Sequence, residues 1–319
     1  RLAFRFLSPH GRRARLSVLI FHRVLSQPDP LFPGEIDAAG FDAICRWVKG
    51  WFNVLALDDA ARRLREGSLP ERALAITFDD GYADNHDVAL PILQRHGLPA
   101  TFFIATGFLD GGRMWNDTVI ESIRRTPLPR VDLRGVCGMD LGVHALESPE
   151  GRRAAIDRVI GGIKYMKPDE RQAVVDTIAD RAKTSLPDDL MMTSEQVRGL
   201  HRAGMQIGGH TVSHPILARL DRRAARDEIE VGKKTLEALV AEPVRLFAYP
   251  NGKPVEDYTG EAVSLAKELG FDAAVSTAWG AASAMADPFQ LPRFTPWDRT
   301  KLRFGARLAA NLRNSAPAR

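Results

Sequence analysis

The sequence predicts an α/β fold with a parallel sheet in a single domain, 1–319. Apolar runs of strand length alternate with longer helical patterns along most of the chain, and this alternation is typical of βαβ units. The chain has 319 residues, of which 45% are hydrophobic, so it can bury one large core. One apolar run also ends in two adjacent aspartates, and the carboxyl end of a parallel strand is where such folds carry their chemistry.

Before residue 106, strand and helix patterns alternate strictly. Each helical pattern is followed by a glycine, which is a common stop signal for a helix. In order, we expect a strand at 16–21, a helix at 37–49, a strand at 52–55, a helix at 58–66, a strand at 73–78, a helix at 84–96 and a strand at 100–105.

Residues 111–190 interrupt the alternation. They are rich in Gly, Pro and Arg and show only short helical patterns, at 116–125 and 170–183. We interpret them as an insertion. Because the insertion follows a strand end, we expect it at the same rim of the sheet as the aspartates.

After the insertion the alternation resumes. Thr193 and Gln196 form the signature of a capping box at the start of a helix. In order, we expect a helix at 193–203, a strand at 205–208, a helix at 221–241, a strand at 246–248, a helix at 261–269, a strand at 273–276 and a basic C-terminal helix at about 299–313. The apolar face of this last helix predicts that it packs on the domain; the alternative is that it rests on an anionic membrane surface.

Polar residues follow two of the predicted strands. Asp79 and Asp80 come directly after one strand, and His210 and His214 follow another, from which Gly208 lets the backbone turn sharply. Taken singly, an aspartate before a glycine is an ordinary turn signal, and a spaced His pair is often accidental. Taken together, two imidazoles and one carboxylate are a ligand set that zinc accepts with an open position for water, so we predict a metal site.

Composition limits the other classes of function. The net charge of +4 gives no support to nucleic-acid binding without a matching motif, although basic residues gather at both termini and would suit peripheral membrane contact. Cys45 and Cys137 are too few for a disulfide framework. No apolar run has membrane-spanning length and no signal peptide is visible, which favours a cytoplasmic or membrane-peripheral location, although a leader removed before Arg1 stays open. The oligomeric state is not indicated.

Three segments resemble known motifs. Thr77-Phe-Asp-Asp-Gly81, His210-Thr-Val-Ser-His214 and Phe247-Ala-Tyr-Pro-Asn-Gly252 are similar to the first three motifs of the polysaccharide deacetylases, the NodB-homology or carbohydrate esterase family 4 enzymes. The resemblance starts at Leu19-Ile-Phe-His-Arg-Val24 and runs to Leu291-Pro-Arg-Phe294. It implies a distorted (β/α) barrel with the insertion after the catalytic-aspartate unit, and a metal-dependent hydrolase that removes N- or O-acetyl groups from a glycan.

The resemblance also implies roles for individual residues. Asp80, His210 and His214 would hold a divalent metal, with zinc expected, and Asp79 would be the base that takes a proton from the attacking water. The backbone N–H of Asn251 matches the position of the family's oxyanion donor. The residues expected to contact the acetylated glycan are Tyr82, Tyr249, Pro250, Trp115 and Asp117; the alternative for Trp115 is that it closes a small core.

Two positions depart from the family pattern. The late histidine that serves as the general acid is absent, because His214 is the last histidine in the chain. His22, at the end of the first strand, is our candidate for that role, against a substrate contact or a structural histidine. The arginine that braces the base is replaced by Ala248, and Arg293 is our candidate to reach the same carboxylate and keep it ionised, whereas Arg245 is interpreted as a surface charge.

These residues leave three functions open. The first is a metal-dependent deacetylase of a polysaccharide or lipid-linked glycan, with N-acetyl favoured. It is preferred because a protein that only binds would not need a second carboxylate beside the ligand. The second is a catalytically silent carbohydrate-binding relative, suggested by the missing acid and arginine. The third is a metal-dependent hydrolase of another small amide or ester.

Overall fold

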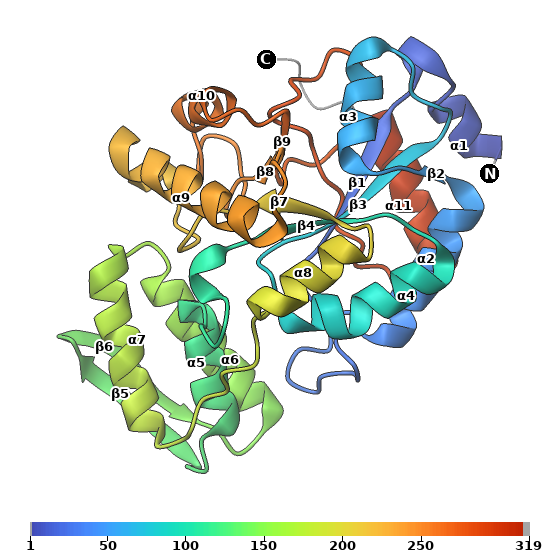
Figure 1. The fold of residues 1–319 in the computed structure, drawn as a ribbon. Helices are drawn as coiled ribbons and strands as arrows, with labels where there is room; N and C mark the ends of the chain where they lie inside the picture. Colours follow the sequence, from blue (N-terminus) through green and yellow to red (C-terminus); the bar gives the residue numbers. More distant parts are fainter. Residues whose placement is uncertain (1, 315–319) are drawn as a thin grey trace. The chain divides into compact units, whose positions relative to one another are not determined.

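A computed structural model describes residues 2–314, which divide into two compact units (Figure 1). The first unit comprises residues 2–27, 36–109 and 192–314. The second comprises Pro28–Glu35 and Asp110–Met191, and so contains the segment interpreted as an insertion together with a short piece from earlier in the chain.

The first unit follows the predicted alternation of strands and helices. Its strands are β1 (Leu16–Phe21), β2 (Asn53–Val54), β3 (Ala73–Phe78), β4 (Thr101–Ile104), β7 (Gln206–Gly209), β8 (Leu246–Ala248) and β9 (Ala273–Val275). Its α-helices are α1 (Leu2–Leu7), α2 (Ala38–Trp51), α3 (Leu57–Glu66), α4 (Leu90–His96), α8 (Ser194–Arg202), α9 (Arg222–Val240), α10 (Gly260–Glu268) and α11 (Lys301–Arg313). Short helical turns lie at η1 (Gly11–Arg13), η2 (Asn85–Ala89), η3 (Thr106–Phe108) and η4 (Leu217–Arg219).

The strands form one curled parallel sheet in the order β1-β3-β4-β7-β8-β9, with β2 paired to the first residues of β3. The two edges of the sheet are joined by the segment Leu291–Phe294. Leu291 pairs with Val275 of β9 and Phe294 pairs with Leu19 of β1, both in parallel. The predicted distorted (β/α) barrel is therefore confirmed, and irregular chain rather than a full strand closes it.

Alternation along β3 decides which side chains point into the barrel. Successive residues of a strand face opposite sides of the sheet. Ala73 and Ala75 belong to a cluster with residues of β1, β4, β8, β9 and Leu291, which fills the inside of the sheet. Leu74, Ile76 and Phe78 instead join the cluster that packs against the surrounding helices. By the same alternation Asp79, just beyond the strand, lies on the inner side.

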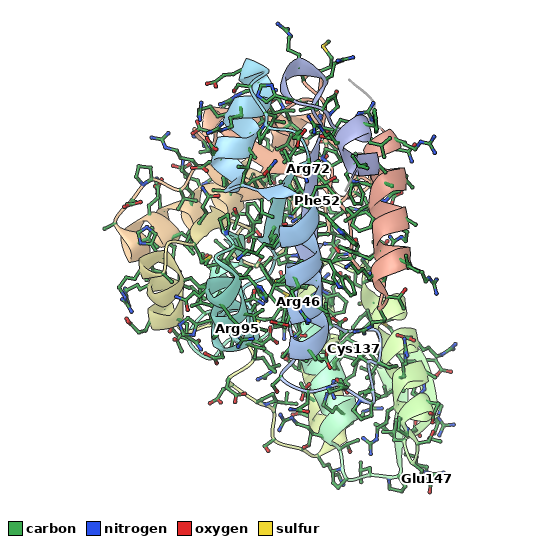
Figure 2. The ribbon with its side chains drawn as sticks, turned by 90° about the vertical axis from the view of Figure 1, so that its right-hand side faces the viewer. Arg46, Phe52, Arg72, Arg95, Cys137 and Glu147 are labelled. Atoms are coloured by element: carbon green, nitrogen blue, oxygen red, sulfur yellow. The ribbon has the colours of Figure 1, made fainter. Side chains whose placement is uncertain are left out.

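The helices surround the sheet and begin and end where the sequence predicts, within a few residues. Asp37 caps α2 by accepting from the N–H of Gly40, Gly97 ends α4 in a left-handed conformation, and Thr193 with Gln196 forms the predicted capping box of α8. Figure 2 shows Arg46 on α2 and Arg95 near the end of α4; both guanidinium groups donate to Asp42, at 2.9 and 3.2 Å. Exposed ion pairs of this kind contribute little to stability.

One helix differs from its prediction. The pattern at 84–96 predicts continuous α-helix, but its first turn, η2, is a π-helix and α4 begins only at Leu90. Pi-helical turns inside helices frequently occur at functional sites. This turn begins at Asn85, shortly after Asp79 and Asp80.

The second unit has its own core. It contains α5 (Trp115–Arg125), α6 (Pro149–Ile163), α7 (Pro168–Ala182) and an antiparallel pair, β5 (Arg130–Val136) and β6 (Met139–Ala145). The hairpin and α6 were not predicted. A signal for the hairpin exists, because Val131 and Leu133 are buried and alternate with exposed residues. The abundance of Gly, Pro and Arg in this segment obscures it.

The C-terminal helix α11 packs on the first unit. Phe304, Leu308 and Leu312 are buried in its core, whereas Leu302 is exposed. This is the first of the two interpretations of the helix, and membrane contact through the basic termini stays a prediction. Within residues 2–314 no helix has both the length and the apolar character to cross a membrane.

Candidate active site

The two aspartates follow β3 in a tight turn. Gly81 adopts φ +92°, a conformation that favours glycine, and its N–H donates to the carbonyl of Asp79. Asp80 itself has φ +76°. The turn sends the two carboxylates in different directions, and both are buried, with 3% and 7% of Asp79 and Asp80 exposed.

Asp80 meets the two histidines that follow β7. Its Oδ1 lies 3.3 Å from Nε2 of His210 and 3.3 Å from Nε2 of His214. The three candidate ligand atoms lie within 4.8 Å of one another. Asp80 Oδ1 is buried and makes no hydrogen bond to the described residues. A buried, unsatisfied carboxylate oxygen between two imidazole nitrogens fits a divalent cation, and this donor set suits zinc.

The environment prepares both imidazoles to bind through Nε2. Nδ1 of His210 lies 2.8 Å from the carbonyl oxygen of Ala248 and donates to it, which turns Nε2 toward Asp80. Burial opposes a charge on this imidazole, but Asp80 and Asp79 outweigh burial and raise the pKa of His210. Burial lowers the pKa of His214 to about 4, so that imidazole is neutral at physiological pH. Burial opposes the charge of Asp80, but the neighbouring histidines outweigh it and lower the pKa of Asp80.

The turn from His210 to His214 is held by α9. Glu228 Oε2 accepts hydrogen bonds from the N–H groups of Val212 and Ser213, both at 2.9 Å, and its Oε1 accepts from the Ser213 hydroxyl. Without these acceptors the two N–H groups would need other partners. Glu228 therefore fixes the turn that presents His214.

Gly208 has a different role from the one predicted. Neither it nor Gly209 adopts a positive φ, so neither is needed for a sharp turn. A Cβ on Gly208 would lie 2.4 Å from the ring of Phe103. The missing side chain leaves room for the ring of Phe103, the residue paired with Gly208 on β4.

Arg293 braces Asp79 from the segment that closes the barrel. Its Nη1 and Nη2 each donate to one oxygen of Asp79, both at 2.7 Å. Its Nε donates to the carbonyl of Ser276, and Nη1 also reaches Thr77 Oγ1. The Arg293 side chain is 0% exposed. Ala248 provides no such group, so Arg293 supplies the guanidinium from the segment that closes the barrel.

The ion pair keeps Asp79 charged. Burial alone would raise the pKa of Asp79, but the guanidinium of Arg293 and the imidazole of His210 outweigh it and lower the pKa. Asp79 is thus an ionised carboxylate that is almost sealed from solvent, next to the candidate ligand Asp80.

His22 lies at the end of β1 with an exposed side chain. Phe21 pairs with Phe78 in parallel register and its carbonyl accepts from the N–H of Asp79 at 2.9 Å, so the backbone of His22 lies beside that of Asp79. The carbonyl of His22 accepts from Asn85 Nδ2 at 2.8 Å. Of the three interpretations of His22, the buried structural histidine is excluded by this exposure.

Strained backbone gathers at these turns. Asp80, Thr211, His214 and Asn251 all have φ between +54° and +76°. For residues with a side chain this conformation costs about 1 kcal/mol or more each. Such outliers cluster at functional sites because the surrounding structure over-determines them.

The residues around Asn251 correct two predictions. Tyr249 is 0% exposed, its hydroxyl donates to the carbonyl of Phe289 at 3.0 Å, and its ring stacks on Tyr258. It is a core residue and its side chain cannot contact a substrate. Pro250 is buried as well, which leaves little of its ring for that contact. Asn251, half-buried after β8, stays a predicted oxyanion donor.

Three further substrate predictions have different outcomes. Tyr82 is 5% exposed and the guanidinium of Arg23 covers one face of its ring at 4.7 Å, so its contact with a substrate stays a prediction. In the second unit, Asp117 is 5% exposed, and its contact with a glycan likewise stays a prediction. Trp115 packs on the core of that unit with Arg171 over its ring, which is the alternative interpretation of Trp115.

Sequence patterns did not find Glu228, Asp84 or Asn85. Each acts on a segment far along the chain: Glu228 on the histidine turn, and Asp84 with Asn85 on residues 22–24. The local sequence gives one weak signal for these contacts, which is Asn85 placed soon after the two aspartates.

Comparison with known sequences gives a family match. The profile of the family described as Polysaccharide deacetylase matches residues 66–149 and 163–274. The chain is 22% identical over 272 residues to YxkH of Bacillus subtilis strain 168, which carries the name of a polysaccharide deacetylase; the match covers 85% of this chain and 67% of YxkH. It is 25% identical over 115 residues to the poly-β-1,6-N-acetyl-D-glucosamine N-deacetylase of Staphylococcus aureus strain MSSA476, and covers 36% of this chain and only 39% of that enzyme.

Two solved structures share the fold. The deacetylase PplD of Streptococcus pyogenes, in complex with acetate, superposes with a TM-score of 0.58 at 18% identity, and the match covers 88% of this chain and 92% of PplD. IcaB from Ammonifex degensii superposes with a TM-score of 0.58 at 17% identity, and covers 96% of this chain and 99% of IcaB. At these identities the likeness establishes the fold alone.

We predict that metal-free protein takes up one zinc ion through Asp80, His210 and His214. Binding to the folded state alone would stabilise it by about 2.7 kcal/mol when free zinc is 100 times its Kd. Calorimetric titration and thermal unfolding with and without zinc measure both effects. His210→Ala should abolish both the zinc uptake and the stabilisation. The matched control is His201→Ala, which should keep both, because His201 lies on α8 and pairs with Glu242. Equal zinc uptake in the two variants would contradict the assignment.

We also predict that Arg293→Met destabilises the fold by about 3–5 kcal/mol, because it leaves the Asp79 carboxylate buried without its partner. Denaturant unfolding of the metal-free protein measures this. Arg245→Met is the control: Arg245 is 58% exposed and 3.6 Å from Asp272, so its loss should cost within about 0.5 kcal/mol. A cost for Arg293→Met no larger than that of the control would rule out a structural role for the ion pair.

Proposed function

The chain belongs to the polysaccharide deacetylase family, and from this premise we propose that it hydrolyses acetyl groups from an acetylated glycan with the help of a bound divalent metal. The single observation that carries the proposal is the placement of two buried carboxylates. Asp80 faces two imidazoles, and Asp79, beside it, is held ionised by Arg293. A binding protein would need the first arrangement but not the second.

Asp80, His210 and His214 would hold the metal, with zinc as the expected ion. A divalent ion bound there would polarise the acetyl carbonyl and make a bound water more acidic. The chain itself then has to move protons and stabilise charge. Its residues near the metal site divide these tasks.

Asp79 is the proposed base. It is ionised and lies next to the candidate ligand, so it can accept the proton of the water that attacks the acetyl carbon. Arg293 keeps the carboxylate charged and fixes its orientation through two hydrogen bonds, at the expense of some basicity. This fixed orientation leaves Asp79 few alternative positions.

Asn251 and His22 are proposed for the remaining steps. The N–H of Asn251, in its left-handed turn, is the proposed donor to the oxyanion that forms as water adds. His22, exposed at the end of β1 beside the end of β3, is the proposed donor of a proton to the departing sugar amine. The proton gained by Asp79 and the proton lost by His22 then balance the reaction.

The substrate class is proposed from the relatives. The staphylococcal protein is named for N-deacetylation of poly-β-1,6-N-acetyl-D-glucosamine. We propose an N-acetylated polysaccharide or lipid-linked glycan for this chain as well. A catalytically silent relative is the second candidate, because Ala248 replaces the usual arginine and the late histidine is missing. The Arg293 ion pair weakens that candidate.

Asp79→Asn should lower turnover by about 1,000-fold, within the range of general-base catalysis, and keep the zinc content of the wild type. The measurement is acetate release from β-1,6- and β-1,4-linked oligomers of N-acetylglucosamine, with zinc determined on the same samples. His86→Gln, at a half-buried histidine on η2 with no proposed role, is the control. Wild-type protein that takes up zinc but never releases acetate would favour the silent relative.

His22→Ala should slow release of N-acetyl groups by about 100-fold and that of the acetyl group of 4-nitrophenyl acetate much less, since a good leaving group needs little protonation. The two substrates are compared through kcat on the same preparation. Equal losses on both would assign His22 to positioning of the substrate rather than to proton donation.

A further inference from the structure

The segment that carries His22 is tied to the segment that carries the aspartates. Asp84 Oδ1 accepts from the N–H of Val24 at 3.1 Å, and Asp84 Oδ2 accepts from Arg23 Nε at 2.8 Å. Asn85 Nδ2 donates to the carbonyl of His22 at 2.8 Å and to Asp84 Oδ1 at 3.2 Å. Residues 22, 23 and 24 are thus each bound by one of two adjacent side chains.

The two clamping side chains are themselves immobilised. Asn85 is 0% exposed and begins the π-helical turn η2, and its N–H donates to the carbonyl of Tyr82. The Asp84 side chain is 11% exposed, and burial raises its pKa in spite of Arg23. A short rigid path therefore connects Asp80 to the backbone that follows the His22 Cα, at the carbonyl of His22 and the N–H of Val24.

The clamp holds backbone and leaves the imidazole uncovered. His22 is exposed, whereas its carbonyl and the following residues are fixed. This division is what a proton donor on a loop requires, because its ring must reach the substrate while its Cα stays in place. Catalytic groups lose much of their effect when they are displaced by about 1 Å.

We propose that Asp84 and Asn85 are positioning residues that act on deacetylation through His22. The inference rests on the proposed function, in which His22 supplies the proton to the leaving amine. It adds that the π turn after the aspartates sets the distance between the metal-binding side of the site and its acid. Neither residue is required to touch substrate or metal.

A double-mutant cycle tests the inference in zinc-loaded protein. Asn85→Ala should lower kcat on a β-1,6-linked N-acetylglucosamine oligomer by about 10- to 100-fold and change kcat on 4-nitrophenyl acetate much less. In the His22→Ala background the same change should have little further effect, because the group that it positions is gone. Losses that multiply in the double variant would overturn the proposal. Asp84→Asn, which keeps the shape of the side chain, gives the same cycle should Asn85→Ala fail to fold.

Asn311→Ala is the matched control. Asn311 is also 0% exposed, also has a buried Oδ1 without a hydrogen-bond partner among the described residues, and donates to Ser17 Oγ at the opposite end of β1. Asn311→Ala should lower the thermal unfolding temperature about as much as Asn85→Ala does, and its effect on kcat should not be coupled to that of His22→Ala. If Asn311→Ala coupled to His22→Ala as strongly as Asn85→Ala does, the coupling would reflect general loosening and the proposal would be wrong.

Hydrogen exchange tests whether the backbone after His22 is held in place, and it needs no measurement of activity. The amide of Val24, which donates to Asp84 Oδ1, should exchange at least about 10-fold faster in Asp84→Ala than in the wild type, and at an unchanged rate in Asn311→Ala. If the wild type released no acetate from either probe, the proposed function would fail, and unchanged exchange at Val24 would separately overturn the clamp. We expect faster exchange at Val24, together with a kcat loss in the double variant that is smaller than the product of the two single losses.

Discussion

The ion pair between Asp79 and Arg293 is the interaction on which the site depends. A carboxylate that is 3% exposed would take up a proton if it had no charged partner, and a protonated Asp79 could not act as a base. Arg293 comes from the segment that bridges β9 and β1, so the same residue neutralises the carboxylate and anchors the closure of the barrel. The segment that closes the barrel therefore also carries the side chain that keeps the Asp79 carboxylate ionised.

The parallel sheet explains why the metal-binding residues and the base can lie together. Strands β3 and β7 are separated in the sheet only by β4, and their carboxyl ends open on the same rim. Gly208 leaves room for the ring of Phe103 on β4, so the two strands can pair in the register that brings the histidines to this rim. Left-handed turns at Asp80, Thr211 and His214 then aim the side chains inward, and Glu228 fixes one of these turns from α9.

The second unit shows where prediction from the sequence is weakest. The break in strand and helix alternation predicted an insertion at 111–190, but residues 28–35 of the same unit were not part of the prediction. Its hairpin and α6 were missed, and the role of Trp115 was drawn from residue type. Tryptophan suits sugar binding and also suits a small core, and burial decides between the two. Burial depends on neighbours far along the chain. The same reason explains Tyr249, whose place in a motif suggested a substrate contact although its hydroxyl serves Phe289.

The resemblance to the polysaccharide deacetylases implied the barrel. From its residues alone, the sequence determined the α/β class with a parallel sheet, the ends of most strands and helices, and the set of Asp79, Asp80, His210 and His214. These follow from patterns within a few residues: alternation of apolar side chains, glycines that stop helices, and polar residues placed just after a strand. The tertiary structure alone decided that Arg293 reaches Asp79, that Glu228 holds the histidine turn, and that Asp84 and Asn85 hold His22. Each of these contacts joins side chains or backbone on different elements, and the Arg293 contact also requires the barrel to close, so no local pattern encodes them.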